Sequence, residues 1–160
     1  MNEKFPMHIM VKPEGLELFP NYLTSKIEML ESLHGEGQYR KLRTTLTPEE
    51  VEMIYPRDTA PKEFKEYLAE HPTEHHFILG DADIYRYTRA MKGKYGIPTG
   101  IRGELAEVLP RMGEKLERWQ NFVHSTDDVE ETRTICFNFN KDTEMCSYCV
   151  ANKICYSVKK

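Results

Sequence analysis

The sequence predicts an α+β fold, in which a ferredoxin-like βαββαβ sandwich has helices on one face of an antiparallel sheet, with further helices added. Three observations support this prediction. Short apolar runs typical of strands alternate with segments whose apolar residues recur every three or four positions, as in amphipathic helices. These elements follow one another as two β-α-β units. The 160 residues have the length of one domain, and 39% of them are hydrophobic, which is enough for a core.

The first two strands flank a long helix. Residues 7–11 form an apolar run that Pro13 and Gly15 end, which predicts a strand followed by a turn. Residues 21–33 have leucine and isoleucine at helical spacing and lead to two glycines, which favour a helix end. Residues 38–46 then predict the second strand.

Two short helices and a third strand come next. Thr47 and Glu50 form a capping-box pattern, which predicts a helix that ends at Tyr55 before a proline. Residues 60–71 predict another helix, and residues 75–79 predict a strand closed by Gly-Asp. Neighbouring strand residues face opposite sides of a sheet, so the His-His pair in this strand is interpreted as structural rather than as a metal site.

The second half of the chain repeats the alternation. Residues 81–92 are expected to form a helix, residues 93–103 a loop rich in Gly and Pro, and residues 104–119 a helix interrupted at a Leu-Pro step. Residues 122–123 are expected to form a short strand, residues 129–132 a helical turn and residues 134–139 a last strand. Residues 1–139 are therefore expected to form the domain. Residues 140–160 are expected to form a polar C-terminal extension.

Composition and charge exclude several classes of function. A net charge of -4 and a pI near 5.9 argue against a surface that coats nucleic acid, although a local basic pocket for a small polyanion is compatible with them. No apolar run approaches membrane-spanning length, and residues 1–6 lack the apolar core of a signal peptide. We therefore expect a cytoplasmic protein with neither nucleic acid nor membrane as a partner.

The cysteines lie in the last quarter of the chain, at Cys136, Cys146, Cys149 and Cys155. In a reducing compartment they are thiols or metal ligands rather than disulfides. The single CxxC pair can supply two corners of a zinc tetrahedron, and the other two cysteines could complete it. The usual zinc signature has two such pairs, so free thiols are the favoured interpretation and no metal ligand is predicted.

A histidine segment supplies the main functional candidate. His124 follows the apolar pair Phe122-Val123 and precedes residues that favour helix N-caps. It is therefore expected where a strand ends and a helix begins, a place where a side chain can face a cleft and backbone N–H groups can meet an anion. Two cations have similar settings: Lys12 directly follows the first strand, and Arg102 is flanked by glycines.

Four segments, in this order, resemble the nucleoside diphosphate kinase family. Residues 9–15 resemble the lysine turn after the family's first strand, and residues 88–93 resemble its arginine-bearing helix end. Residues 100–104 resemble its glycine-flanked arginine loop, and residues 121–127 resemble its histidine segment. Each segment alone is a weak signal, whereas four in one order are specific. The resemblance extends over residues 5–139 and does not include the cysteine-bearing tail.

The resemblance implies a ping-pong phosphotransferase that moves the γ-phosphate of a nucleoside triphosphate to a diphosphate. His124 would attack the γ-phosphorus and become a phosphohistidine, and a neutral imidazole is a nucleophile near pH 7. Mg²⁺ is the implied cofactor, bridging the phosphates. The implied catalytic residues are His124 and Lys12, and the implied nucleotide-binding residues are Lys12, Tyr55, Phe64, Arg89, Tyr95, Arg102 and Asn121.

Departures from the family pattern predict a changed cleft. A family glutamate holds the free ring nitrogen of the histidine, and the matching residues 132–135 contain no acid, which leaves Glu130 or Glu131 as substitutes. The segment before Arg102 is shorter than in the family, the segment after it is longer, and Leu18 replaces an arginine that braces this loop. The resemblance implies a homo-oligomer, but these changes argue against the usual hexamer.

Two alternatives to an active enzyme stay open. The missing orienting acid and the changed loop suggest a nucleotide-binding module of the same fold without catalysis. The tail suggests an interaction protein that recruits a partner or a metal. The enzyme is favoured because the nucleophile and its polar companions are all retained, namely His124, Lys12, Arg89, Arg102 and Asn121.

Overall fold

The structure, a computed structural model, describes residues 4–31, 38–93, 100–108, 120–125, 128–141, 143–152 and 154. Its strands are β1 (Phe5–Val11), β2 (Tyr39–Thr44), β3 (Thr73–Gly80) and β4 (Val123–His124). They form one antiparallel sheet in the order β2-β3-β1-β4, with the first and third strands in the centre. This is the ferredoxin-like order, so the predicted α+β fold class is confirmed.

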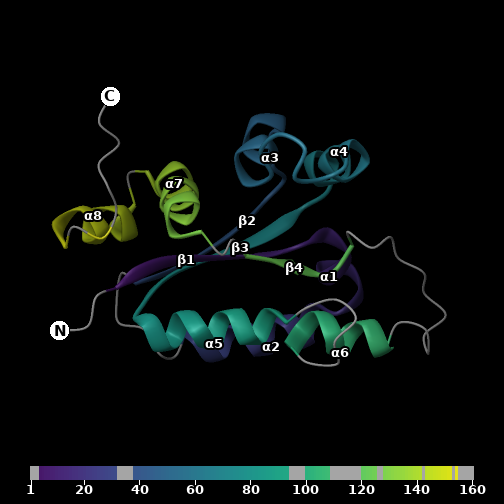
Figure 1. Cartoon of the computed structure of the whole chain (residues 1–160), viewed down its shortest axis with the longest axis horizontal. Coiled ribbons are helices and arrows are strands. Elements are labelled where there is room, and N and C mark those ends of the chain that lie inside the picture. Colours follow the sequence, from purple (N-terminus) through teal and green to yellow (C-terminus); the bar gives the residue numbers. More distant parts are fainter. Residues whose placement is uncertain are drawn as a thin grey trace.

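The helices are α1 (Pro13–Leu18), α2 (Pro20–Glu31), α3 (Pro48–Ile54), α4 (Lys62–Glu70), α5 (Ala82–Lys92), α6 (Gly100–Val108), α7 (Val129–Asn140) and α8 (Glu144–Ala151). In Figure 1, α2, α5 and α6 lie on one side of the sheet, and the added helices α3, α4, α7 and α8 lie on the other. Among the described residues, no helix has both the length and the apolar character needed to span a bilayer.

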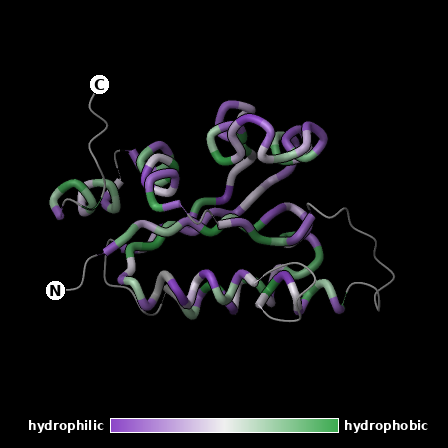
Figure 2. Tube along the Cα trace, in the orientation of Figure 1, coloured by the Kyte–Doolittle hydropathy of each residue, from purple (hydrophilic) through white to green (hydrophobic). Residues whose placement is uncertain are grey.

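Successive side chains of the two central strands point to opposite faces of the sheet. Helices cover both of these faces, so both sets of side chains are buried. Met10 and Phe77 belong to a hydrophobic cluster that α3, α4, α7 and α8 cover. Ile9 and Ile78 belong to a second cluster with residues of α2 and α6. Figure 2 shows hydrophilic and hydrophobic residues alternating along α5, the pattern of an amphipathic helix at the surface.

The prediction of a last strand over residues 134–139 is wrong, because these residues form the second half of α7. Their β-branched and aromatic side chains favour strands by propensity. Tertiary structure overrides this preference: the Asp128 side chain caps the helix by accepting a hydrogen bond from the Glu131 backbone N–H at 3.0 Å. At the other end, Arg40 Nη1 donates to the Phe139 carbonyl oxygen at 2.9 Å, which satisfies one of the last carbonyls of the helix.

Other predicted boundaries also change. The glycine-rich segment is not a loop throughout, because α6 already begins at Gly100. The extension after residue 140 is not merely a polar tail: α8 forms there, with Thr143 as its N-cap and Met145 in the core. The predicted helix over residues 109–119, with its Leu-Pro interruption, lies outside the described residues.

Candidate active site

His124 lies on β4, opposite Met10 of β1. Its ring packs against Tyr55 with 4.5 Å between the ring centroids. The Nε2 atom is buried and has no hydrogen-bond partner in the part of the chain that the structure describes. Burial, followed by the positive charges of Lys12, Arg102 and Lys92, holds the pKa of His124 well below its usual range. The imidazole is therefore neutral near pH 7, which is the nucleophilic form.

Lys12 lies where β1 gives way to α1, and it is only 3% exposed. Its Nζ atom donates a hydrogen bond to Asn121 Oδ1 at 2.6 Å and lies 4.7 Å from the centroid of the Phe64 ring. Burial lowers the pKa of Lys12 to about 7; the carboxylate of Glu14 opposes this shift, and the positive charge of Arg102 adds to it. An anion bound beside Lys12 would therefore stabilise its charged form.

Two further cations hold the backbone on either side of His124. Arg102, in α6, donates to the Val123 carbonyl oxygen through Nε at 3.1 Å and Nη2 at 2.7 Å. Lys92, the last residue of α5, donates through Nζ to the Ser125 carbonyl oxygen at 3.1 Å. The carbonyl oxygens of the residues before and after the histidine thus both accept hydrogen bonds from cations. Sequence analysis did not identify Lys92 as a site residue. The one feature of the sequence that pointed to it was its position within the arginine-bearing helix end.

The turn before His124 is strained. Phe122 has a φ of 75°, and the Val123 N–H donates to the Asn121 carbonyl oxygen at 2.9 Å, which closes a three-residue γ-turn. Such turns with positive φ are rare, and for a bulky residue this region is an outlier. Strain of this kind persists only where the surroundings hold it in place, and it is found preferentially at functional sites.

The segment that follows β1 holds this turn from both ends. Glu14 Oε1 accepts a hydrogen bond from the Phe122 N–H at 3.1 Å, and the Phe122 carbonyl oxygen accepts one from the Lys12 backbone N–H at 2.8 Å. Glu14 Oε2 accepts another from the Tyr67 hydroxyl at 3.1 Å. Gly15 permits the close approach, because a Cβ atom there would lie 2.9 Å from the Phe122 carbonyl oxygen. Sequence analysis gave Glu14 no role.

Replacing Glu14 by alanine is expected to lower the free energy of unfolding by about 2 kcal/mol, because the buried Phe122 N–H would lose its acceptor. The Glu17→Ala variant, with a change at an exposed position of the same helix, is the matched control and should unfold as the wild type does. Urea denaturation followed by circular dichroism measures both. Equal midpoints for the two variants would show that Glu14 does not support the turn.

Tyr55 is 8% exposed, and its buried hydroxyl has no partner among the residues that the structure describes. Burial raises the pKa of this hydroxyl, and the positive charge of Arg102 opposes the shift. An unsatisfied buried hydroxyl destabilises a protein, so Tyr55→Phe is expected to raise the free energy of unfolding of the ligand-free protein by about 1 kcal/mol. Tyr87→Phe, at a side chain that is 45% exposed, is the control. A less stable Tyr55→Phe variant would contradict this expectation.

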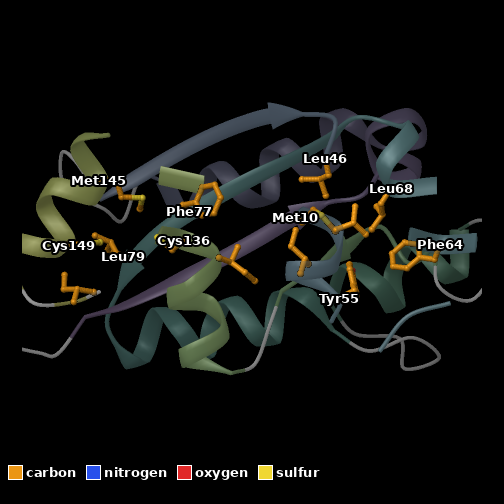
Figure 3. Packing of buried hydrophobic residues seen from close by; sticks show 14 residues of the cluster. Met10, Leu46, Tyr55, Phe64, Leu68, Phe77, Leu79, Cys136, Met145 and Cys149 are labelled. Atoms are coloured by element: carbon orange, nitrogen blue, oxygen red, sulfur yellow. The ribbon is translucent and has the colours of Figure 1, made fainter. Parts of the chain in front are cut away.

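The other residues that the resemblance implied have different settings. Phe64 is 2% exposed and packs edge-on against Tyr55, at 5.0 Å between centroids, with Lys12 over its ring. Its expected stacking on a nucleotide base would therefore require the side chain to move. Arg89 has an exposed side chain on α5, and Tyr95 lies outside the described residues. Figure 3 shows Phe64 at one end of the hydrophobic cluster, with Tyr55 between it and Met10.

No carboxylate in the described part of the chain accepts a hydrogen bond from the buried ring nitrogen of His124. The two substitutes considered from the sequence, Glu130 and Glu131, are both exposed, and Glu130 pairs with Arg133 at 2.5 Å. The imidazole is held instead by packing against Tyr55, while cations hold the adjacent backbone.

The described residues contain no group of three His, Cys, Asp or Glu side chains that could bind a metal ion. Cys136 and Cys149 are buried in the core with Met145. In Figure 3, Met145 and Cys149 lie at the opposite end of the cluster from Tyr55, and Cys136 lies between them and Met10. The fourth cysteine, Cys155, lies outside the described residues, so a site of four thiolates stays a sequence-based alternative.

The adjacent histidines of β3 have separate partners. His75 Nδ1 lies 2.9 Å from Nε2 of His8, and His76 Nε2 lies 2.8 Å from a carboxylate oxygen of Glu74. Burial lowers the pKa of His75 to about 4, so it is neutral near pH 7. These contacts account for both side chains as parts of the packed sheet.

Comparison with known proteins gives structural neighbours only. No family model matches the sequence, and no curated protein matches it. The nucleoside diphosphate kinase of Aquifex aeolicus is similar in structure, with a TM-score of 0.61 at 18% identity over 86% of this chain and 96% of that chain. The enzyme of Encephalitozoon cuniculi gives a TM-score of 0.64 at 18% identity over 86% and 90%.

A third neighbour is a transition state mimic of the nucleoside-diphosphate kinase of Borrelia burgdorferi with bound vanadate and ADP. It gives a TM-score of 0.57 at 14% identity over 81% of this chain and 82% of that chain. The three comparisons agree over more than four fifths of the sequence. At these identities they establish the architecture, and the chain therefore has the fold of the nucleoside diphosphate kinases.

Proposed function

We propose that the protein is a nucleoside diphosphate kinase-type phosphotransferase, which moves the γ-phosphate of a nucleoside triphosphate to a nucleoside diphosphate through a phosphohistidine at His124. The observation that supports this most strongly is a neutral imidazole surrounded by Lys12, Arg102 and Lys92. Phosphoryl transfer depends mainly on positioning and on cations that stabilise the negative charge of the transferred group. This arrangement supplies a nucleophile and that positive charge together.

Binding of the nucleotide comes first. Lys12 and Arg102 attract the polyphosphate, and Lys12 becomes fully charged as the anion binds. Asn121 uses its Oδ1 atom to accept from Lys12, so its amide N–H groups are suited to donate to the sugar or the phosphates. The strained turn at Phe122 fixes Asn121 and His124 relative to each other.

Transfer then proceeds at the other ring nitrogen. Because Nε2 is buried, Nδ1 is the nitrogen that remains for the substrate. Nδ1 forms a bond to the γ-phosphorus while the bond from that phosphorus to the β,γ-bridging oxygen breaks, and the diphosphate leaves with the electron pair. The proton of the imidazole stays on Nε2 throughout. A second diphosphate reverses these steps and removes the phosphoryl group from His124.

Mg²⁺ enters this proposal with the nucleotide, as part of the substrate. The described residues offer no ligand set for it, and the charged side chains around His124 are mainly the cations Lys12, Arg102 and Lys92, which do not bind metal ions. On the phosphates, Mg²⁺ neutralises part of the charge that Lys12 and Arg102 do not. A homo-oligomeric state and a cytoplasmic location are part of the proposal on sequence grounds alone.

The test is to incubate the protein with γ-labelled ATP and Mg²⁺. We expect phosphate on the protein that is acid-labile and sensitive to hydroxylamine, located on His124 by mass spectrometry of the peptide that contains it. Addition of a different nucleoside diphosphate should remove the label and yield the matching triphosphate. Label on another residue, or no label at all, would overturn the proposal.

A nucleotide-binding module without catalysis is the second candidate, favoured by the unpartnered Nε2 atom of His124. Without a group that orients the ring, a rate can fall by orders of magnitude while binding persists. Calorimetric binding of ADP together with the absence of γ-phosphate exchange would identify the module. Exchange at an enzymatic rate would exclude it.

A further inference from the structure

Lys92 is a cation of the site that the implied set of nucleotide-binding residues does not contain. Its Nζ atom donates to the carbonyl oxygen of Ser125, the residue directly after His124. Arg102 makes the corresponding contact with Val123, the residue directly before His124. Lys92 is half-buried at the end of α5, whereas the Arg89 side chain, three residues earlier, is exposed. The helix end thus brings its lysine to the residue that follows the histidine, while the side chain of its arginine is exposed.

The charge of Lys92 acts on the other ionisable groups of the site. Its positive charge disfavours the charged form of Lys12 and also that of His124. Three cations therefore gather around one imidazole, and the buried carboxylate beside them, Glu14, is already hydrogen-bonded to the Phe122 N–H and the Tyr67 hydroxyl. Like charges this close repel one another, and a bound polyanion relieves that repulsion.

We propose that Lys92 is a phosphate-binding residue of this site and contacts the polyphosphate of the nucleotide together with Lys12 and Arg102. This inference rests on the proposed function, because it assigns a further ligand to the same substrate. An ammonium group has three N–H donors, so a bond to the Ser125 carbonyl is compatible with a bond to a phosphate oxygen. A charge-assisted bond of this kind contributes strongly to affinity.

Lys92 could instead serve only to hold the backbone at Ser125, and two properties separate this role from phosphate binding. A purely structural lysine would stabilise the ligand-free protein through its hydrogen bond. A phosphate-binding lysine would destabilise the ligand-free protein through repulsion and stabilise the complex. Lys92→Gln is the decisive variant, because glutamine keeps an N–H donor and removes the charge. Lys92→Arg keeps the charge.

The experiment measures binding of ADP and of inorganic tripolyphosphate by calorimetry, and the rate of phosphohistidine formation from ATP with Mg²⁺. We expect Lys92→Gln to weaken binding of both ligands by about 10- to 100-fold, and Lys92→Arg to retain binding within about 3-fold. The melting temperature of ligand-free Lys92→Gln should equal or exceed that of the wild type. Lys62→Gln is the control, since Lys62 lies on the surface and pairs with Glu66 at 3.6 Å.

A second readout follows the charge itself. Removing the charge of Lys92 raises the pKa of Lys12, so the pH at which ADP affinity begins to fall should move upward in Lys92→Gln. The charge of Lys92 acts on Lys12 in the ligand-free protein, so this shift is expected with either role, and the loss of affinity for ADP and tripolyphosphate decides between them. Wild-type affinity in Lys92→Gln, or equal losses of melting temperature and binding in Lys92→Gln and Lys92→Arg, would overturn the inference. A wild-type protein that neither binds ADP nor becomes phosphorylated would overturn the proposed function itself.

Discussion

The His124→Ala variant is expected to incorporate no phosphate from ATP and to lose more than about 10⁴-fold of the rate of γ-phosphate exchange, the scale of loss seen when a covalent nucleophile is removed. Covalent catalysis divides a difficult transfer into two easier steps, and both steps need the same nitrogen atom. Without the imidazole, the cations of the site are expected to bind the nucleotide still but to offer no acceptor for the γ-phosphoryl group.

Binding of ADP distinguishes loss of chemistry from loss of structure in this variant. Lys12, Arg102 and Asn121 remain, so ADP affinity should stay within about 3-fold of the wild type, a difference below 1 kcal/mol. Quenched-flow labelling measures the first half-reaction, and calorimetry measures the affinity. Label that survives in His124→Ala would assign the nucleophile to another residue. Loss of ADP binding would mean that the variant had perturbed the whole site.

The sequence predicts the central fold because its information is local. The run at residues 7–11 and the capping box at Thr47 each lie within a single element. The structure confirms the first as part of β1 and the second as the start of α3. The prediction of a strand at residues 134–139 was wrong because the strand propensity of these residues is weaker than the effect of their tertiary contacts. The cap at Asp128 and the burial of Ile135 and Cys136 select a helix, and neither effect is visible in a window of six residues.

The candidate site divides in the same way. The resemblance gave Lys12, Arg102 and His124 because each lies in a recognisable segment. Lys92 and Glu14 gain their roles from contacts that join residues 33 and 108 positions apart, which no local pattern contains. The positive φ of Phe122 could not be predicted from the sequence either, because an aromatic residue rarely adopts this conformation. Departures from local rules, held in place by distant partners, are expected where a site is built.

Replacing Lys12 by methionine is the second change with a large expected effect. Loss of the charge should lower the rate of phosphohistidine formation by about 10²- to 10³-fold, the range found when one preorganised donor is removed from a transition state. The ligand-free variant should nevertheless be more stable than the wild type, because it no longer buries a charge in a side chain that is 3% exposed. Single-turnover kinetics and thermal denaturation measure the two effects. Lower stability would show that the bond from Lys12 to Asn121 outweighs the burial penalty.

The pH dependence of the wild type follows from the same residue. The pKa of Lys12 falls from 10.5 to about 7 on folding, so between these values the unfolded chain binds a proton that the folded protein does not. The contribution of Lys12 to the free energy of unfolding therefore rises with pH across that window.

The affinity for nucleotide should change with pH in the opposite direction. A polyphosphate favours the charged amine, so ADP affinity should be greatest below pH 7 and fall as the pH rises above it. Calorimetry in buffers of different ionisation enthalpy should detect proton uptake on binding at pH 8. Lys12→Met should show neither the fall nor the uptake, and a wild-type affinity that stays constant from pH 7 to pH 9 would contradict the role of Lys12 as a phosphate ligand.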